Sequence, residues 1–184
     1  MFGAVIVENR PIDTDWLIQF KSFLPSDWEI VCFKNHSVKT LNDYNTLMTS
    51  RTLWEAIPFD KVLIFQQDAK LLRSWDAEFE QFDYIGSPWR FQEHGGNGGL
   101  SWRSKEMMLR VIEQYPYNVS AYGYEDVYFS NHIESVGGKL APRDVCSRFA
   151  VESVFTLGAM GAHAIEKYLS KEEVKLIYSQ YDKR

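Results

Sequence analysis

The segment at residues 61–68, KVLIFQQD, constrains the fold more than any other part of the sequence. Four consecutive apolar residues, Val62 to Phe65, are typical of a strand that is buried on both faces of a sheet. The strand ends abruptly in QQD, so polar side chains gather at its carboxyl end. Because ligands of open α/β sheets bind beyond the carboxyl ends of the strands, we expect a site beside Gln66 and Asp68.

Strand and helix patterns alternate in the first half of the chain. Short apolar runs at residues 4–8 and 28–33 predict strands, and residues 14–24 between them have apolar side chains at helical spacing. A further helix is predicted over residues 41–57, where Pro58 stops it. This alternation, followed by a more mixed second half, predicts an α/β sandwich with a mostly parallel central sheet flanked by helices.

The second half contains further patterns of both kinds. Strands are predicted for FDYIGSPW (82–89) and GGLSWRS (98–104), and short extended or irregular pieces for GKLAP (138–142) and SRFAVES (147–153). Helices are predicted for SKEMMLRVIEQY (104–115), begun by Ser104, for YEDVYFSNHIESV (124–136), and for SKEEVKLIYSQYD (170–182), capped by Ser170. We expect order everywhere except in the last residues, 181–184.

Length and charge exclude several classes of protein. The 184 residues predict one domain, spanning 1–184, and the 45% hydrophobic content is far from that of a disordered chain. A net charge of −5 argues against a nucleic-acid partner, because phosphate contacts need a clustered basic surface. No apolar stretch approaches ~18 residues and the N-terminal residues do not form a signal peptide, so we predict a cytoplasmic protein without a membrane span.

Cys32 and Cys146 are predicted to be buried free thiols.

A glycine-rich segment, GGNGGLSWRS at residues 95–104, follows the strand candidate that ends in Trp89. Each glycine gives up more backbone freedom on folding than any other residue type, so four of them around Asn97 are costly. Flexible linkers are longer, rich in serine and not bracketed by large aromatic residues such as Trp89 and Trp102. The segment therefore predicts a tight backbone that another group approaches closely.

Three other positions have the residue types that a catalytic site needs. Asp68 follows a buried strand, where a carboxylate can bind Mg²⁺ or Mn²⁺ or simply cap the next turn. Glu125 and Asp126, in YGYED, begin a predicted helix, where they can bind and deprotonate a hydroxyl or merely complement the helix dipole. His163, in GAMGAH, can bind a metal through a ring nitrogen or serve as a structural residue.

Taken in order, these motifs resemble the GT-A class of nucleotide-sugar-dependent glycosyltransferases. The strand-end acid, GNGGLSWRS entering a helix, YGYED and the late histidine are similar to the motif pattern of its β-1,4-galactosyltransferase branch. VLIFQQD, FDYIGSPW, GNGGLSWRS and EDVYF resemble more closely a family of small GT-A-like proteins, over roughly residues 4–163. The resemblance implies a GT-A-like, Rossmann-related fold and a hexosyltransferase of glycan biosynthesis that moves a sugar from a nucleotide diphosphate to an acceptor hydroxyl.

The resemblance also implies roles for individual residues. Asp68 and His163 would bind Mn²⁺ or Mg²⁺ together with the sugar diphosphate. Asp126 would be the base of an inverting reaction, and Glu125 would hold the acceptor hydroxyl. The substrate-facing residues implied in this way are Arg10 near the phosphates, Gln66, Asn97, Gly98, Gly99, and Trp89 or Trp102 stacked on a sugar ring.

One departure from the resemblance leaves alternatives open. Many relatives have Asp-x-Asp where this chain has Gln66-x-Asp68. The change removes one negative charge from the metal site, so sugar transfer without a metal is an alternative mechanism. A carbohydrate-binding or scaffold module that kept the fold and lost transfer is the first rival function. A nucleotidyltransferase is the second, although VENRPIDTD (7–15) lacks the glycine-rich basic loop of that class. The donor, the acceptor and membership of a longer protein stay open.

Overall fold

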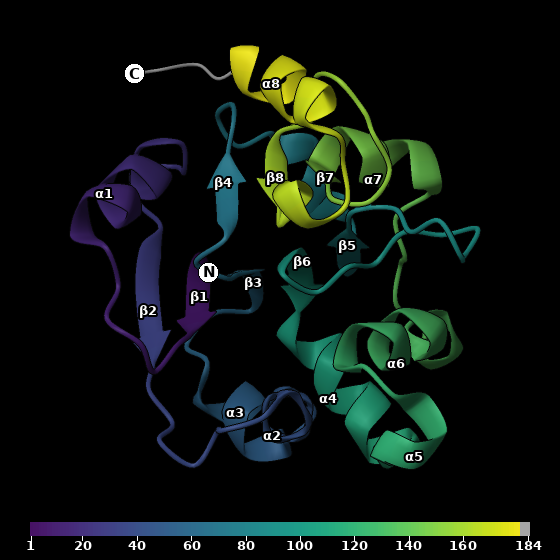
Figure 1. Cartoon of the computed structure of the whole chain (residues 1–184). Coiled ribbons are helices and arrows are strands. Elements are labelled where there is room, and N and C mark those ends of the chain that lie inside the picture. The colour runs from purple at the N-terminus through teal and green to yellow at the C-terminus, as the bar shows by residue number, and fades with distance from the viewer. Residues whose placement is uncertain (181–184) are drawn as a thin grey trace.

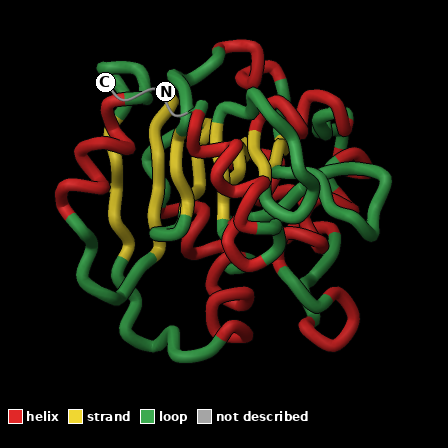
Figure 2. The backbone as a smooth tube through the Cα atoms, turned by 45° about the horizontal axis from the view of Figure 1, so that its top comes forward, coloured by secondary structure: helices red, strands yellow, loops and turns green. Residues whose placement is uncertain are grey.

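The computed structural model describes residues 1–180, in which the three strands predicted in the first half pair side by side. β1 (Phe2–Val7) is parallel to both β2 (Glu29–Phe33) and β3 (Lys61–Phe65), and α1 (Thr14–Ser22) connects the first two. Figure 2 shows the strands running alongside one another with helices on both sides. The prediction of an α/β fold is confirmed, whereas the prediction for residues 181–184 lies outside the described residues.

The central sheet is mixed, so the prediction of a mostly parallel sheet is wrong. Its strand order is β2-β1-β3-β6-β5, where β5 (Tyr84–Gly86) and β6 (Leu100–Ser104) complete the sheet. β6 is antiparallel to both β3 and β5. Parallel neighbours need a crossover connection, usually a helix, but residues 87–99 join β5 to β6 as a loop without a helix. The chain therefore reverses direction at β6.

A second, three-stranded sheet has the order β4-β8-β7 and lies beside the carboxyl end of β3. It consists of β4 (Ala69–Leu71), β8 (Gly161–His163) and β7 (Ala150–Val151). β4 is antiparallel to β8 with Ala69 opposite His163, and β7 is parallel to β8 with Val151 opposite Ala162. This register brings the residues that flank β4, β7 and β8 together.

The helices lie in separate groups around the two sheets (Figure 1). Along the lower side of Figure 1 are α2 (Leu41–Met48), α3 (Arg51–Ala56), α4 (Lys105–Gln114), α5 (Val119–Tyr122) and α6 (Glu125–His132). Near the top are α8 (Lys171–Ser179) and, to its right, α7 (Arg143–Phe149), next to β8 and β7. Short 3-10 turns are η1 (Ala77–Gln81), η2 (Glu134–Val136) and η3 (Ile165–Lys167).

Local signals placed some helix ends correctly and missed others. The side chains of Ser104 and Ser170 accept backbone N–H groups at the starts of α4 and α8, as predicted. The helix predicted over residues 41–57 is interrupted after Met48, because the Ser50 side chain caps a second helix, α3. Residues 143–149 form a helix although SRFAVES was expected to be extended or irregular, because Val145, Cys146 and Phe149 bury one side of it.

Alternate side chains of β3 enter two different cores. Leu63 and Phe65 pack toward α1, where Phe65 stacks on Phe20 with ring centroids 4.3 Å apart. Val62 and Ile64 pack with helices on the other face of the sheet. Full burial of each such side chain stabilises the fold by roughly 1.5–3 kcal/mol, so β3 is a rigid base for the polar residues that follow it.

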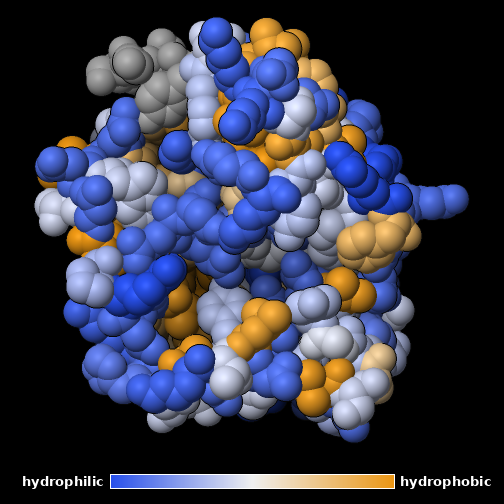
Figure 3. All heavy atoms as spheres, in the orientation of Figure 1, coloured by the Kyte–Doolittle hydropathy of each residue, from blue (hydrophilic) through white to orange (hydrophobic). Residues whose placement is uncertain are grey.

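The two cysteines differ in exposure. Cys146 is a buried free thiol, as predicted, but Cys32 is an exposed one. The prediction for Cys32 fails because β2 is the edge strand of the central sheet and none of its five residues is fully buried. On the face shown in Figure 3, hydrophilic side chains predominate and hydrophobic ones are scattered among them. Across residues 1–180, no helix combines the length and apolar character needed to cross the bilayer.

Candidate functional site

An open cleft of about 590 Å³ lies beyond the carboxyl end of β3. Its walls come from α2, the end of β3, the loop at residues 87–99, the start of α6, the residues after β7, and the end of β8 with the residues that follow it. Most of the candidates from the sequence line this one cleft: Gln66, Trp89, Asn97, Gly98, Gly99, Glu125, Asp126 and His163. The site predicted beside β3 is therefore a real concavity.

Asp68 does not line the cleft itself but contacts His163, which does. His163 Nε2 lies 3.2 Å from Asp68 Oδ1 and 3.2 Å from Gln66 Oε1. The other carboxylate oxygen of Asp68 accepts a hydrogen bond from Lys167 Nζ at 2.8 Å. Hydrogen bonds from His163 and Lys167 hold the pKa of Asp68 well below its usual range, so this carboxylate is ionised.

A buried acid, Glu152, lies on the other side of the His163 ring. Its Oε1 is 3.2 Å from His163 Nδ1 and accepts a hydrogen bond from Asn97 Nδ2 at 2.7 Å. Burial of the ring opposes its charge, but the hydrogen bonds with Asp68 and Glu152 raise the pKa of His163 to about 9. In the protein without ligands, the ring is therefore protonated at neutral pH. Nδ1 then donates its hydrogen toward Glu152, and Nε2 donates its hydrogen toward Asp68 and Gln66.

The side-chain atoms gathered here are of the types that a divalent cation accepts as ligands. Asp68 Oδ1, Gln66 Oε1 and His163 Nε2 converge, and a carboxylate behind the imidazole is the usual partner of a metal-binding histidine. Within residues 1–180, no three His, Cys, Asp or Glu side chains form a metal site. Mg²⁺ and Mn²⁺ accept oxygen ligands and usually share their coordination with water and phosphate, so a partial protein site suits them.

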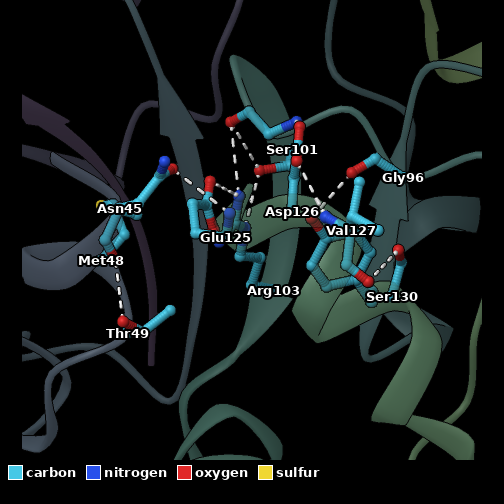
Figure 4. Close-up of polar contacts among 12 residues, drawn as sticks. Asn45, Met48, Thr49, Gly96, Ser101, Arg103, Glu125, Asp126, Val127 and Ser130 are labelled. Atoms are coloured by element: carbon cyan, nitrogen blue, oxygen red, sulfur yellow. Dashed lines mark hydrogen bonds and ion pairs between the residues drawn. The ribbon is translucent and has the colours of Figure 1, made fainter. Parts of the chain in front are cut away.

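Glu125 is a buried ion-pair residue, which changes the role predicted for it. Arg103, fully buried on β6, donates to Glu125 Oε2 at 2.6 Å and to Oε1 at 2.9 Å. Asn45 Oδ1 accepts the backbone N–H of Glu125, so that Glu125 lies between Asn45 and Arg103 (Figure 4). Both carboxylate oxygens are bound to a guanidinium, and we therefore assign Glu125 to holding α6 in place rather than to binding the acceptor hydroxyl.

Asp126 is the carboxylate that faces the cleft next to the glycine segment. Its Oδ2 accepts the backbone N–H of Gly98 at 2.9 Å, and its Oδ1 accepts the N–H of Val127 at 2.8 Å. Burial, together with the neighbouring charge of Glu125, raises the pKa of Asp126 to about 6. A carboxylate with this pKa is ionised at neutral pH and is a stronger base than an ordinary aspartate, which suits proton transfer.

The glycines make room for protein side chains. A Cβ on Gly98 would lie 2.4 Å from Glu125 Oε1, and a Cβ on Gly99 would lie 2.1 Å from the His163 ring. The sequence predicted a backbone that another group approaches closely, and the resemblance implied that this group is the substrate; in the structure the approaching groups are protein side chains, although both glycines still line the cleft. Absence of a Cβ is what lets the Glu125 carboxylate and the imidazole approach the backbone of this segment.

Gly99→Ala is expected to destabilise the protein by about 1–3 kcal/mol, because the new methyl group must displace a packed ring. Urea denaturation measures the loss. In a His163→Ala background the same methyl group has space, so there the cost of Gly99→Ala should nearly vanish. Strict additivity of the two changes would show that the ring does not determine the need for glycine.

Two predicted contact residues lie away from the cleft. Trp102 is fully buried, stacked on Trp28 with ring centroids 5.3 Å apart, so it cannot contact a sugar. Arg10 donates two side-chain N–H groups to Glu8 and does not line the cleft, because this neighbouring acid binds its guanidinium.

Trp89 lines the cleft but is only 4% exposed, and its ring is stacked on Phe91, which is 69% exposed. Phe91 is therefore the ring that the loop between β5 and β6 presents beside the cleft, and the predicted stacking of Trp89 on a sugar ring has little exposed surface to use.

Three site residues were missed by the sequence analysis. Glu152 follows an apolar pair in SRFAVES, and an acid directly after a buried strand is the same signal that identified Asp68. Arg103 follows Trp102 inside a predicted strand, and a charge within a buried strand predicts a buried partner. Lys167 had no sequence signal, because only the fold brings it to Asp68.

Comparisons with known proteins bear on family and fold. The model of a family described as "Protein of unknown function (DUF5672)" matches residues 27–163. A solved glycosyltransferase involved in the glycosylation of the major capsid of PBCV-1 is similar with a TM-score of 0.59 and 9% identity, over 97% of this chain and 98% of that chain. A197 from STIV has a TM-score of 0.47 and 15% identity, over 75% and 78% of the two chains. No curated protein matches the sequence. At 9% identity, the likeness to the PBCV-1 enzyme shows a shared fold alone.

Proposed function

The chain belongs to the family described as proteins of unknown function (DUF5672), and we propose that it is a glycosyltransferase. It would move a sugar from a nucleotide-diphosphate donor to an acceptor hydroxyl. The observation that carries the proposal is Asp126, a carboxylate of raised pKa in the same cleft as Lys167 and His163, which lie beside Asp68. A base at one position and cations at another are the groups that displacement of a diphosphate requires.

The reaction would proceed by direct displacement. Asp126 accepts the proton of the acceptor hydroxyl while the oxygen of that hydroxyl forms a bond to the anomeric carbon of the donor sugar. The bond from that carbon to the diphosphate oxygen breaks, and the electron pair leaves with the nucleoside diphosphate. Attack on the face opposite the leaving group inverts the configuration at the anomeric carbon. Lys167, whose ammonium has N–H donors beyond the one that binds Asp68, stabilises charge on the diphosphate.

A divalent cation is part of the proposal. Asp68, Gln66 and His163 would hold Mn²⁺ or Mg²⁺, and binding there requires the proton on His163 Nε2 to leave. When bound, such a cation neutralises negative charge that develops on the leaving diphosphate.

A ligand screen tests the proposal against a non-catalytic binding module. Thermal shifts with UDP- and GDP-sugars, each with and without Mn²⁺, should identify a donor that stabilises the native state. Slow hydrolysis of that donor should follow, because an active transferase transfers some sugar to water. A donor that binds without any hydrolysis or transfer would favour the binding module, and absence of any nucleotide binding would refute the proposal.

The rate of transfer is expected to fall as the pH drops below about 6, with the acid limb set by Asp126. Protonation removes the lone pair that accepts the hydroxyl proton, so the base is active above its pKa and inactive below it. Values of kcat/KM measured between about pH 5 and about pH 8 should show this limb, with Mn²⁺ kept saturating at each pH so that protonation of His163 does not add a limb of its own. A rate independent of pH across that range would argue against Asp126 as the base.

A further inference from the structure

Glu152 is a buried carboxylate for which the proposed reaction has no direct use. It is 5% exposed and follows β7 at the wall of the cleft. Its Oε1 lies between two partners, His163 Nδ1 at 3.2 Å and Asn97 Nδ2 at 2.7 Å. A buried charge is costly unless it is paired and hydrogen-bonded, so this arrangement calls for an explanation.

The sheet register determines where Glu152 lies. β7 is parallel to β8 with Val151 opposite Ala162, so the next residues along, Glu152 and His163, are neighbours. A carboxylate that accepts the Nδ1 hydrogen of an imidazole fixes the ring orientation and leaves Nε2 directed to the opposite side. In this protein that side holds Asp68 Oδ1 and Gln66 Oε1.

Asn97 connects Glu152 to the other half of the site. While its Nδ2 donates to Glu152, its Oδ1 accepts the backbone N–H of Gly99 at 3.1 Å. The N–H of Gly98, between them, donates to Asp126. An unbroken series of short-range contacts therefore joins the residue proposed as base to the ring proposed as metal ligand.

We propose that Glu152, set in place by Asn97, is a positioning residue that directs His163 Nε2 at a divalent cation bound with a nucleoside diphosphate. This inference rests on the proposed function. Without the carboxylate the imidazole can rotate about its side-chain bonds, and the cation then loses a well-directed ligand. Glu152 would also hold the His163 side of the cleft at a fixed distance from Asp126, through the glycine segment.

The test uses the whole chain and Mn²⁺ as the probe, with free Mn²⁺ followed by electron paramagnetic resonance in the presence of UDP or GDP. Glu152→Met keeps the length of the side chain and removes the acceptor, and it should weaken Mn²⁺ binding by about 10–100-fold. Glu152→Gln keeps an oxygen that accepts the Nδ1 hydrogen, so it should retain most of the affinity. Glu166→Gln is the matched control, because it removes one charge from an exposed acid of η3 that bonds Tyr178 instead of His163.

The outcomes separate this inference from the function on which it rests. Equal Mn²⁺ affinity in Glu152→Met and wild type would overturn the role of Glu152 and leave the transferase proposal intact. An equal loss in Glu166→Gln would also overturn it, because general charge and not ring position would then control binding. A wild-type chain that binds neither Mn²⁺ nor a nucleotide would refute the proposed function itself. Should Glu152→Met fail to fold, Asn97→Ala offers a second variant, expected to weaken Mn²⁺ binding while leaving the Glu152 carboxylate present.

Discussion

Asp126→Asn is expected to lower turnover by roughly 10²-fold or more while donor affinity stays near that of the wild type. The amide keeps the shape of the carboxylate, and its oxygen can still accept the backbone N–H of Gly98. It cannot accept a proton from the acceptor hydroxyl. The loss should therefore appear in kcat, measured with the donor found by the thermal-shift screen, and calorimetric binding of that donor should be almost unchanged.

Stability provides an internal control for this variant. Folding raises the pKa of Asp126 from 3.8 to about 6, so the folded chain binds this proton more tightly than the unfolded chain. The resulting stabilisation is fully present below pH 3.8 and is lost as the pH rises through about 6. At neutral pH the ionised carboxylate thus lowers stability, a loss that the neutral amide removes. The amide nitrogen, however, cannot accept the N–H of Val127, so the two effects oppose each other and the melting temperature should change little.

A matched acid distinguishes chemistry from helix-end charge. Asp144 lies in the first turn of α7, as Asp126 does in α6, but its carboxylate pairs with Arg148 on an exposed surface. Asp144→Asn should leave turnover within about twofold of wild type, since exposed pairs contribute little. Full activity of Asp126→Asn, or an equal loss in both variants, would remove Asp126 from the proposed mechanism.

The sequence predicted those features that depend on neighbouring residues. The apolar run at residues 62–65 needs no distant partner to indicate a buried strand, and a serine before a helical run caps it through its own side chain. Asp126 was also found locally, because an acid pair at a helix start is visible in YGYED. These local signals were enough to identify most of the candidate residues, and the fold places most of them in one cleft.

Features that depend on distant pairing could not be predicted in this way. The direction of β6 follows from the path of a loop without a helix, and no residue within β6 specifies it. Contact between Glu152 and His163 depends on β7, a strand of only two residues. The roles assigned to Gly98 and Gly99 were wrong for the same reason, since the side chains that fill their space come from α6 and β8.

Arg103→Met is expected to destabilise the protein by about 3–5 kcal/mol, because it leaves the Glu125 carboxylate buried without its partner. Native domains have only about 5–15 kcal/mol of stability, so this loss is a large share of the total. Urea denaturation of wild type and variant gives the difference from the shift in midpoint. A loss below about 1 kcal/mol would show that water or another group solvates Glu125.

The double variant Arg103→Met/Glu125→Leu tests whether the ion pair only holds α6 in place or whether Glu125 also binds the acceptor hydroxyl. Replacing a buried ion pair by apolar side chains of similar size is often neutral or stabilising, so the double variant should recover most of the lost stability. If Glu125 only positions α6, the refolded double variant should also retain transfer activity. Its acid limb should move to lower pH, because Glu125 raises the pKa of Asp126 more than Arg103 lowers it. Recovered stability with abolished acceptor binding would instead return Glu125 to the role of holding the acceptor hydroxyl.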